Sequence, residues 1–127
     1  MNTYKLLRTN DSGKLQLTDF TIEQNVPDQL KRFQEIVGGY IEIPYISEYL
    51  ADHRIDIIIN EEGKILELPM TALVTDGTSI VDVICGNVIF ASTDDDGNTI
   101  GLTPEQITIV ENLPKTMMGL QIPFRKE

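Results

Sequence analysis

The sequence predicts an α+β fold in which an antiparallel or mixed sheet of about five to seven short strands packs with two helices. Three observations lead to this prediction. Short runs rich in Val, Ile and Leu recur along the chain, separated by turns that contain Gly, Asn or Asp. Two segments instead carry helix signals. The links between strands are of hairpin type, and two helices are too few for a doubly wound sheet.

The chain begins with a predicted hairpin. Residues 3–7 and 15–20 are short strand-like runs, and Asn10–Gly13 separates them with a glycine-bearing turn. Leu15 and Leu17 alternate with polar neighbours, as a half-buried strand requires.

A helix is expected to begin at Pro27, because proline lacks an N–H and already has a helical φ. Gly38-Gly39 is expected to end it, since glycine readily adopts the left-handed conformation of a C-cap. A phosphate-binding loop would need more glycines and a basic or hydroxyl residue. The apolar stripe predicted for this helix consists of Val26, Leu30, Phe33 and Val37.

Residues 40–46 predict a strand with Ile41 and Ile43 on one face. Pro44 cannot donate to a ladder, so this strand is expected at a sheet edge or to end there. Residues 47–53 fit either one helical turn or a loop.

Residues 54–60 form the clearest predicted strand, because they are rich in β-branched residues. Residues 61–64 are interpreted as the turn of a central hairpin. In the expected register, Ile59 lies opposite Leu66 and Ile57 opposite Leu68, which places apolar side chains together.

Two further strands are predicted at residues 80–84 and 87–91, after a turn at residues 75–78. Gly86 between them indicates a bulge, a bend or a close backbone approach. Residues 92–98 form a polar loop.

The strongest local signal predicts a second helix. Thr103 is its N-cap, Pro104 its first residue, and Gln106 completes a capping box. Pro114 is expected to stop it. The tail, residues 115–127, is apolar enough to add a strand or to bind a partner.

A chain of 127 residues suits one domain, predicted here as residues 1–127. No apolar run is long enough for a membrane span, and the N-terminus lacks a signal-peptide core. Cys85 is the single cysteine, so no internal disulfide can form. Together these features predict a cytoplasmic protein.

Acidic residues dominate the middle of the chain. The formal net charge is −10, and residues 35–114 hold fifteen acids against Arg54 and Lys64. Direct binding of nucleic acid is therefore not expected, because it requires a basic surface. The alternatives for the acids are a solubilising surface or a binding face. The predicted partner-binding acids are Glu42, Glu48, Asp52, Asp56, Glu61, Glu62, Glu67, Asp94, Asp95 and Asp96.

No catalytic, metal or cofactor site is expected. Asp94–Gly97 suggests a calcium loop, but its register lacks the first ligand and the final Glu of an EF-hand. His53 and Cys85 are too few for zinc, and Cys85 follows an apolar run typical of a core residue. Paired carboxylates such as Glu61 with Glu62, or Asp56 with Glu67, would need a cleft to shift their pKa values.

An ordered set of short motifs resembles a domain family of unknown function that is carried by phages, prophages and plasmids of mostly Gram-positive bacteria. The set spans about residues 30–110 and consists of Gly38-Gly39-Tyr40, Asn60-Glu61-Glu62-Gly63-Lys64, Leu68-Pro69, Gly86 with its apolar flanks, and Leu102-Thr103. The resemblance implies a small accessory protein of a mobile element and transfers no catalytic residue.

The sequence therefore predicts a non-enzymatic accessory protein that binds a host or phage protein partner through an acidic surface. Two alternatives stay open. One is an anti-defence inhibitor whose carboxylates imitate nucleic-acid phosphates, which must be spread along one face. The other is a domain that binds or hydrolyses a small ligand, which requires a pocket with convergent polar groups.

Overall fold

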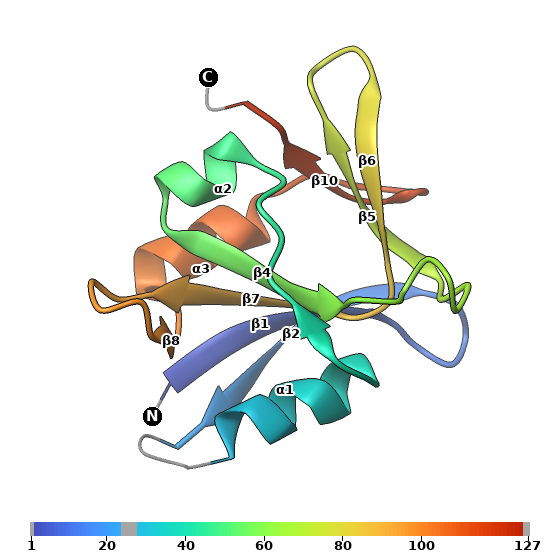
Figure 1. Ribbon diagram of the computed structural model, residues 1–127. Helices are drawn as coiled ribbons and strands as arrows, with labels where there is room; N and C mark the ends of the chain where they lie inside the picture. Colours follow the sequence, from blue (N-terminus) through green and yellow to red (C-terminus); the bar gives the residue numbers. More distant parts are fainter. Residues whose placement is uncertain (1, 24–27, 126–127) are drawn as a thin grey trace.

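The computed structural model describes residues 2–23 and 28–125. In these residues, ten strands and three helices form an α+β fold, which confirms the predicted class (Figure 1). The strands form two sheets, one antiparallel and one mixed. None of the described helices is long and apolar enough to span a membrane.

The central sheet contains six antiparallel strands in the order β2-β1-β7-β4-β3, with β8 paired to β7. The predicted N-terminal hairpin is confirmed as β1 paired with β2. The strands are β1 (Asn2–Thr9), β2 (Leu15–Ile22), β3 (Ile41–Glu42), β4 (Ile55–Asn60), β7 (Val88–Thr93) and β8 (Thr99–Ile100).

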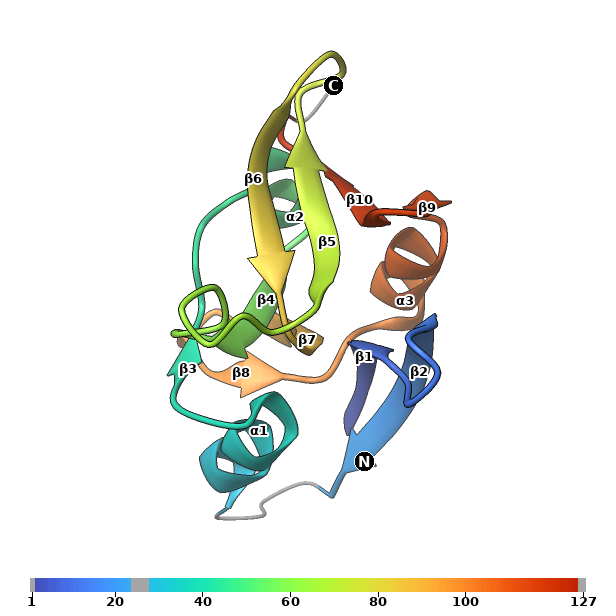
Figure 2. The same ribbon diagram turned by 90° about the vertical axis from the view of Figure 1, so that its right-hand side faces the viewer.

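The second sheet has the order β6-β5-β10-β9 and stands upright over the central sheet (Figure 2). Its β10 runs parallel to β5, and its other pairs are antiparallel. The strands are β5 (Met70–Thr75), β6 (Ile80–Cys85), β9 (Lys115–Thr116) and β10 (Gly119–Pro123). The C-terminal tail thus supplies two strands of this sheet.

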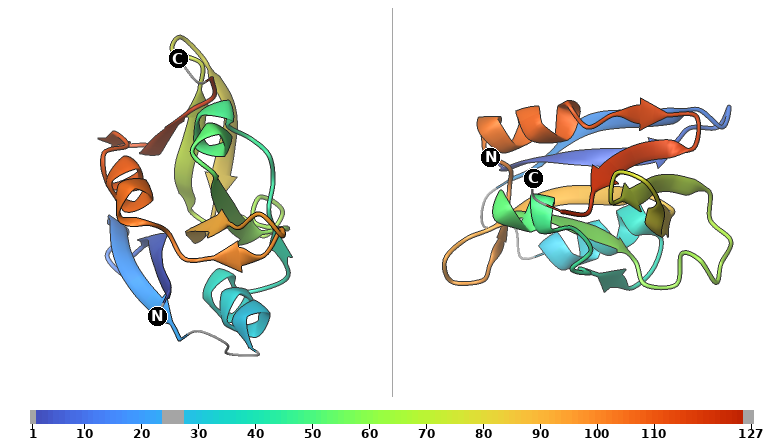
Figure 3. Two further views of the ribbon diagram at one scale, coloured as in Figure 1. Left: turned by 90° about the vertical axis from the view of Figure 1, so that its left-hand side faces the viewer. Right: turned by 90° about the horizontal axis from the view of Figure 1, so that it is seen from above.

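The central sheet is buried on both faces (Figure 3). On one face, Phe33 of α1 (Gln29–Val37) packs in a cluster with Ile58 and Ile89. On the other face lie α2 (Glu48–Asp52), α3 (Pro104–Glu111) and the second sheet. Apolar residues on both faces of β4 explain why its sequence reads as a nearly continuous hydrophobic run.

The helix ends follow the local sequence signals. Gly38 is the left-handed C-cap of α1, with φ 82°, as predicted. The capping box of Thr103 and Gln106 at α3 is also confirmed. Residues 47–53 contain α2 and its two caps, and the hydroxyl of the N-cap Ser47 accepts from the Leu50 N–H at 3.0 Å.

The predicted apolar stripe of α1 was wrong at Leu30, which is 55% exposed. Phe33 and Val37 are buried and Ile36 packs beside them, so the inward face is turned toward Ile36. Val26 and Pro27, expected at the start of this helix, lie outside the described residues.

Lys5 links α3 to the N-terminal hairpin through ion pairs. Its ammonium is buried and lies 2.5 Å from Asp19 of β2 and 2.6 Å from Glu111 of α3. Burial alone would lower the pKa of Lys5, but hydrogen bonds to Asp19 and Glu111 outweigh it and raise the pKa. Both carboxylates are half exposed, so the cluster has access to water.

The strand predicted at residues 40–46 was too long. Only Ile41 and Glu42 form β3, which pairs with β4 at the sheet edge. Ile43 is 46% exposed and does not share a buried face with Ile41. The chain leaves the sheet before Pro44, which cannot donate to the ladder.

The predicted central hairpin was wrong. Residues 61–67 form successive turns, and Ile65 and Leu66 are exposed rather than opposite β4. β4 already pairs with β3 on one edge and β7 on the other, which leaves no edge for a third strand. The loop satisfies its backbone internally, for example by the bond from the Leu66 N–H to the Glu62 carbonyl.

Candidate functional site: a cleft between the two sheets

Several short motifs that are far apart in the sequence meet at the end of β4. Asn60 is the centre of this corner, with a side chain that is almost fully buried. Its Nδ2 donates to the Val37 carbonyl at the end of α1, and its Oδ1 accepts from the Glu62 N–H. A Cβ at Gly39 would lie 2.9 Å from Asn60 Nδ2, so glycine allows this close approach.

The same corner holds the loop after β4 against the end of β6. A Cβ at Gly63 would lie 2.4 Å from the Cys85 carbonyl oxygen, a distance that excludes any side chain. Gly86 has φ 98° and donates its N–H to the Pro69 carbonyl, so it forms the predicted bend. These glycines therefore shape the scaffold next to a cleft.

The cleft has a volume of about 360 Å³ and lies between the two sheets. Its lining comes from residues 42–46, from residues 59–65 and from residues 82–85 of β6. Ile46, Ile59 and Ile84 provide apolar surface, and the polar groups include Glu42 and Glu61. We call this hollow the β6 cleft.

One ion pair crosses the β6 cleft. Lys64 Nζ lies 2.8 Å from Asp82 Oδ1, and the same carboxylate oxygen accepts from the Val83 N–H at 2.8 Å. The hydrogen bond to Asp82 raises the pKa of Lys64, and the nearby Cys85 and Glu42 add to this effect. Lys64 is thus held by Asp82, and Glu42 and Glu61 give the cleft a net negative charge.

Apolar side chains are exposed around the β6 cleft. Of the eleven large hydrophobic side chains exposed in the described residues, three lie on the three segments that border the cleft, and four more lie one or two residues beyond the ends of these segments. Tyr45 is 74% exposed and Ile65 is 77% exposed, values that are unusual for such side chains. The seven are Tyr40, Ile43, Tyr45, Ile65, Leu66, Ile80 and Val81.

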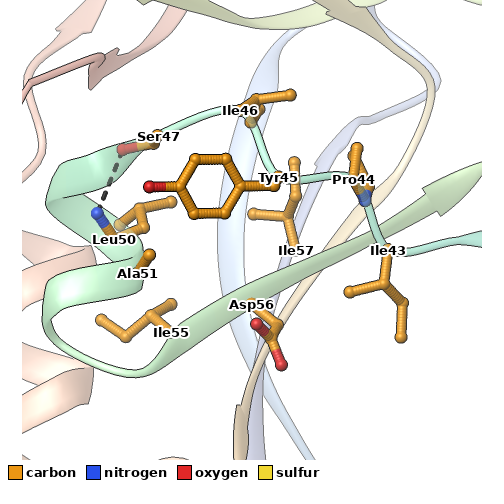
Figure 4. Close-up of a pocket in the computed structure, with 10 residues that line it drawn as sticks. All are labelled: Ile43, Pro44, Tyr45, Ile46, Ser47, Leu50, Ala51, Ile55, Asp56 and Ile57. Carbon is orange, nitrogen blue, oxygen red and sulfur yellow. Dashed lines mark hydrogen bonds between the residues drawn. The ribbon is translucent and has the colours of Figure 1, made fainter.

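A smaller apolar hollow continues from the same segment. It has a volume of about 90 Å³ and lies between residues 43–47, α2 and β4. Figure 4 shows the Tyr45 ring over this space, with Leu50 and Ile55 beside it. The hollow has room for one small side chain and is far below the size of a cofactor site, which is roughly 300 Å³ or more.

The predicted acids form two groups at opposite ends of β4, which spans roughly 20 Å. The first group lies on β3 and on the loop after β4, and consists of Glu42, Glu61, Glu62 and Glu67. The second lies on α2, at the start of β4 and on the loop after β7, and consists of Glu48, Asp52, Asp56, Asp94, Asp95 and Asp96. Of the ten acids, only Glu42 and Glu61, both in the first group, line the cleft.

The second group is engaged in local bonds. Arg54 pairs with Asp95 at 2.9 Å, and Asp56 bonds the Thr93 hydroxyl. Asp94 accepts from the backbone N–H of Asn98 and of Asp96, and these bonds, the first above all, lower its pKa. These residues therefore order the turn after β7, as an Asx turn does.

The comparison with protein-family models identifies the family of the chain. A model described as a domain of unknown function (DUF3846) matches residues 6–115. The chain belongs to this family. Comparisons with curated proteins and with solved structures found no match. In this DUF3846 domain, the motifs that carried the resemblance lie mainly in the corner around Asn60 and along the β6 cleft.

Cys85 and His53 lie at opposite ends of β4 in the DUF3846 domain. The Cys85 carbonyl lies against Gly63, which follows β4, whereas His53 precedes β4 and packs edge-on against Tyr49. The two side chains therefore do not form a nucleophile and base pair. Cys85 is partly exposed in the cleft rather than buried in the core, which corrects its interpretation as a core residue.

Sequence reasoning missed Asp82 and Val83, which carry the polar contacts of the cleft wall. Asp82 is the single acid within the otherwise apolar run IVDVIC of residues 80–85, and this isolation was an available signal. An acid inside a strand pattern is expected at an exposed edge, and β6 is an edge strand.

Proposed function

We propose that this DUF3846 domain is a non-enzymatic binding module that takes an extended segment of a protein partner into the β6 cleft. The observation that carries the proposal is an acidic hollow with seven exposed apolar side chains on, or next in sequence to, the segments that border it. Exposed apolar surface that is rimmed by polar groups is typical of interaction sites. The acidic lining favours a partner segment that combines apolar and basic side chains.

The shape of the site favours a protein over a small ligand. A volume of about 360 Å³ is within the range of small-molecule pockets, so volume alone does not decide. However, Ile65 lines the hollow, Tyr45 and Val81 are next in sequence to lining residues, and all three side chains are exposed. A small ligand would leave these side chains in water, whereas a peptide segment would cover them.

The distribution of acids favours partner binding over nucleic-acid mimicry. A mimic needs carboxylates along one face at spacings like those of phosphates. The ten acids instead form two groups separated by β4, and the second group is used in local turns and ion pairs. On a mobile element, the context implied by the resemblance, the partner would be a host or phage protein.

The proposal is tested with three purified forms of the domain. The cleft variant Glu42→Lys/Glu61→Lys reverses two charges beside β6, and the control Asp95→Lys/Asp96→Lys makes the same change in net charge at the far group. Proteins captured from host lysate are identified, purified and titrated against each form. We expect the cleft variant to weaken binding at least about tenfold and the control to retain affinity. Equal affinity for all three forms would refute the assignment of the cleft.

A further inference from the structure

The wall of the β6 cleft is a free strand edge. Among the strands that the structure describes, β6 is the terminal strand of the second sheet, and it pairs with β5 on one side only. A terminal strand presents backbone N–H and C=O groups that can pair with another chain. Figure 1 shows that the far end of the β5–β6 hairpin extends away from the body of the molecule, whereas at Cys85 the edge lies against the loop at Gly63.

The hydrogen bond of the Val83 N–H indicates which way the backbone groups of this edge point. Its N–H donates to Asp82 Oδ1, and the same oxygen contacts Lys64 Nζ in the cleft. The cleft is lined by β6 and, among the described residues, by none of β5. The Val83 N–H therefore points into the cleft, and the Asp82 carboxylate occupies the place that a neighbouring strand's carbonyl would take.

Charged side chains and bulges commonly protect strand edges from unwanted pairing. β6 has both features, since Asp82 lies on its edge and its register with β5 shifts between Val74 and Thr75. Protection accounts for these two features. It does not account for a hollow of about 360 Å³ beside the edge, or for exposed Ile80 and Val81 on the same strand.

We infer that the partner segment binds as an added β-strand on the edge of β6, where its carbonyl replaces the Asp82 carboxylate as the acceptor for the Val83 N–H. This inference rests on the proposed function and specifies its binding mode. The exchange replaces one acceptor by another, so no buried donor is left unpaired. Lys64 retains Asp82 as its partner and keeps that carboxylate away from the incoming strand.

Strand addition also specifies the chemistry of the ligand. Successive side chains of an added strand point to opposite faces of the sheet. One set would face residues 42–46 and the acids Glu42 and Glu61, and the other would lie over exposed β6 residues. The expected ligand is thus a short extended segment that alternates basic and apolar residues.

The test uses a display library of short linear peptides selected against the whole domain. Selected peptides are titrated against wild type, Val83→Pro and Glu42→Lys/Glu61→Lys, and each peptide is also made with single N-methylated backbone positions. Proline at an edge position removes the outward N–H without removing a ladder bond to β5. Strand addition predicts about tenfold weaker binding to Val83→Pro. It also predicts that N-methylation weakens binding at every second peptide position.

The outcomes separate the two proposals. Peptides that depend on the cleft acids but bind Val83→Pro as tightly as wild type, with no alternation in the N-methyl series, would overturn strand addition and leave the binding module standing. If Val83→Pro does not fold, the N-methyl series alone decides. Failure to select any peptide that depends on the cleft acids would overturn both proposals.

Discussion

Replacing Asn60 by Ala should destabilise the domain, because the Asn60 side chain bonds the end of α1 and the loop after β4. The substitution leaves the Val37 carbonyl and the Glu62 N–H without their partner. Val37 is buried, so its unpaired carbonyl costs about 1–3 kcal/mol, and the Glu62 N–H lies nearer to water and costs about 1 kcal/mol or less. The expected loss is about 2–3 kcal/mol, or roughly 10 °C in Tm for a chain of this length.

The assay is urea unfolding followed by far-ultraviolet circular dichroism, since the chain has no tryptophan. Asn98→Ala is the matched control, because the exposed Asn98 side chain makes one bond to Asp94 at 3.2 Å. We expect the control to change the free energy of unfolding by about 0.5 kcal/mol or less. Equal effects of the two substitutions would refute the view that Asn60 holds α1, β4 and the following loop together.

Three further predictions concern the same scaffold. Gly63→Ala should lower the free energy of unfolding by about 1–3 kcal/mol, because the added Cβ would lie 2.4 Å from the Cys85 carbonyl oxygen. An unchanged urea midpoint would contradict this packing. Thr103→Ala should cost about 1 kcal/mol through the lost capping box, and Thr103→Ser should restore most of it. Asp94 has a pKa below its ordinary value of 3.8, so its charge stabilises the fold above that pH, and the contribution is lost as the pH falls through the lower folded-state value. Asp94→Asn should therefore lower the free energy of unfolding at pH 7 and lower it progressively less in acid. A difference between variant and wild type that does not change with pH would be inconsistent with this linkage.

Elements with a local physical cause were predictable from the sequence. The capping box at Thr103 and the left-handed cap at Gly38 depend on residues within one helical turn. The hairpin of β1 and β2 has a short turn, in which the Asn10 side chain accepts from the Ser12 and Lys14 N–H groups. In each case the bonding partner lies a few residues away, so the local sequence pattern is sufficient to predict the element.

Strand pairing between distant segments was not predictable in the same way. The pattern of Ile57, Ile59, Leu66 and Leu68 matched a hairpin, and only the positions of β3 and β7 exclude it. Both neighbours of β4 come from elsewhere in the chain, and apolar alternation does not specify which strand is adjacent. The turn at residues 61–67 is therefore a loop that borders the cleft.

The candidate site was likewise predictable only in its local features. Sequence composition located an acidic middle region, but it could not divide the acids between the two ends of β4. It also missed Asp82, whose role depends on β6 being an edge strand and on Lys64 reaching it across the cleft. The glycines at positions 39, 63 and 86 were visible in the sequence, but the atoms that they accommodate were not.

Hydrogen–deuterium exchange of the whole domain, with and without a saturating selected peptide, tests the central claim most directly. Binding in the β6 cleft predicts slower exchange in residues 42–46, 59–65 and 80–85, with the Val83 amide among the protected groups. The turn at residues 94–98 should exchange at the same rate in both states. Protection at residues 94–98 with no change along β6 would contradict the account.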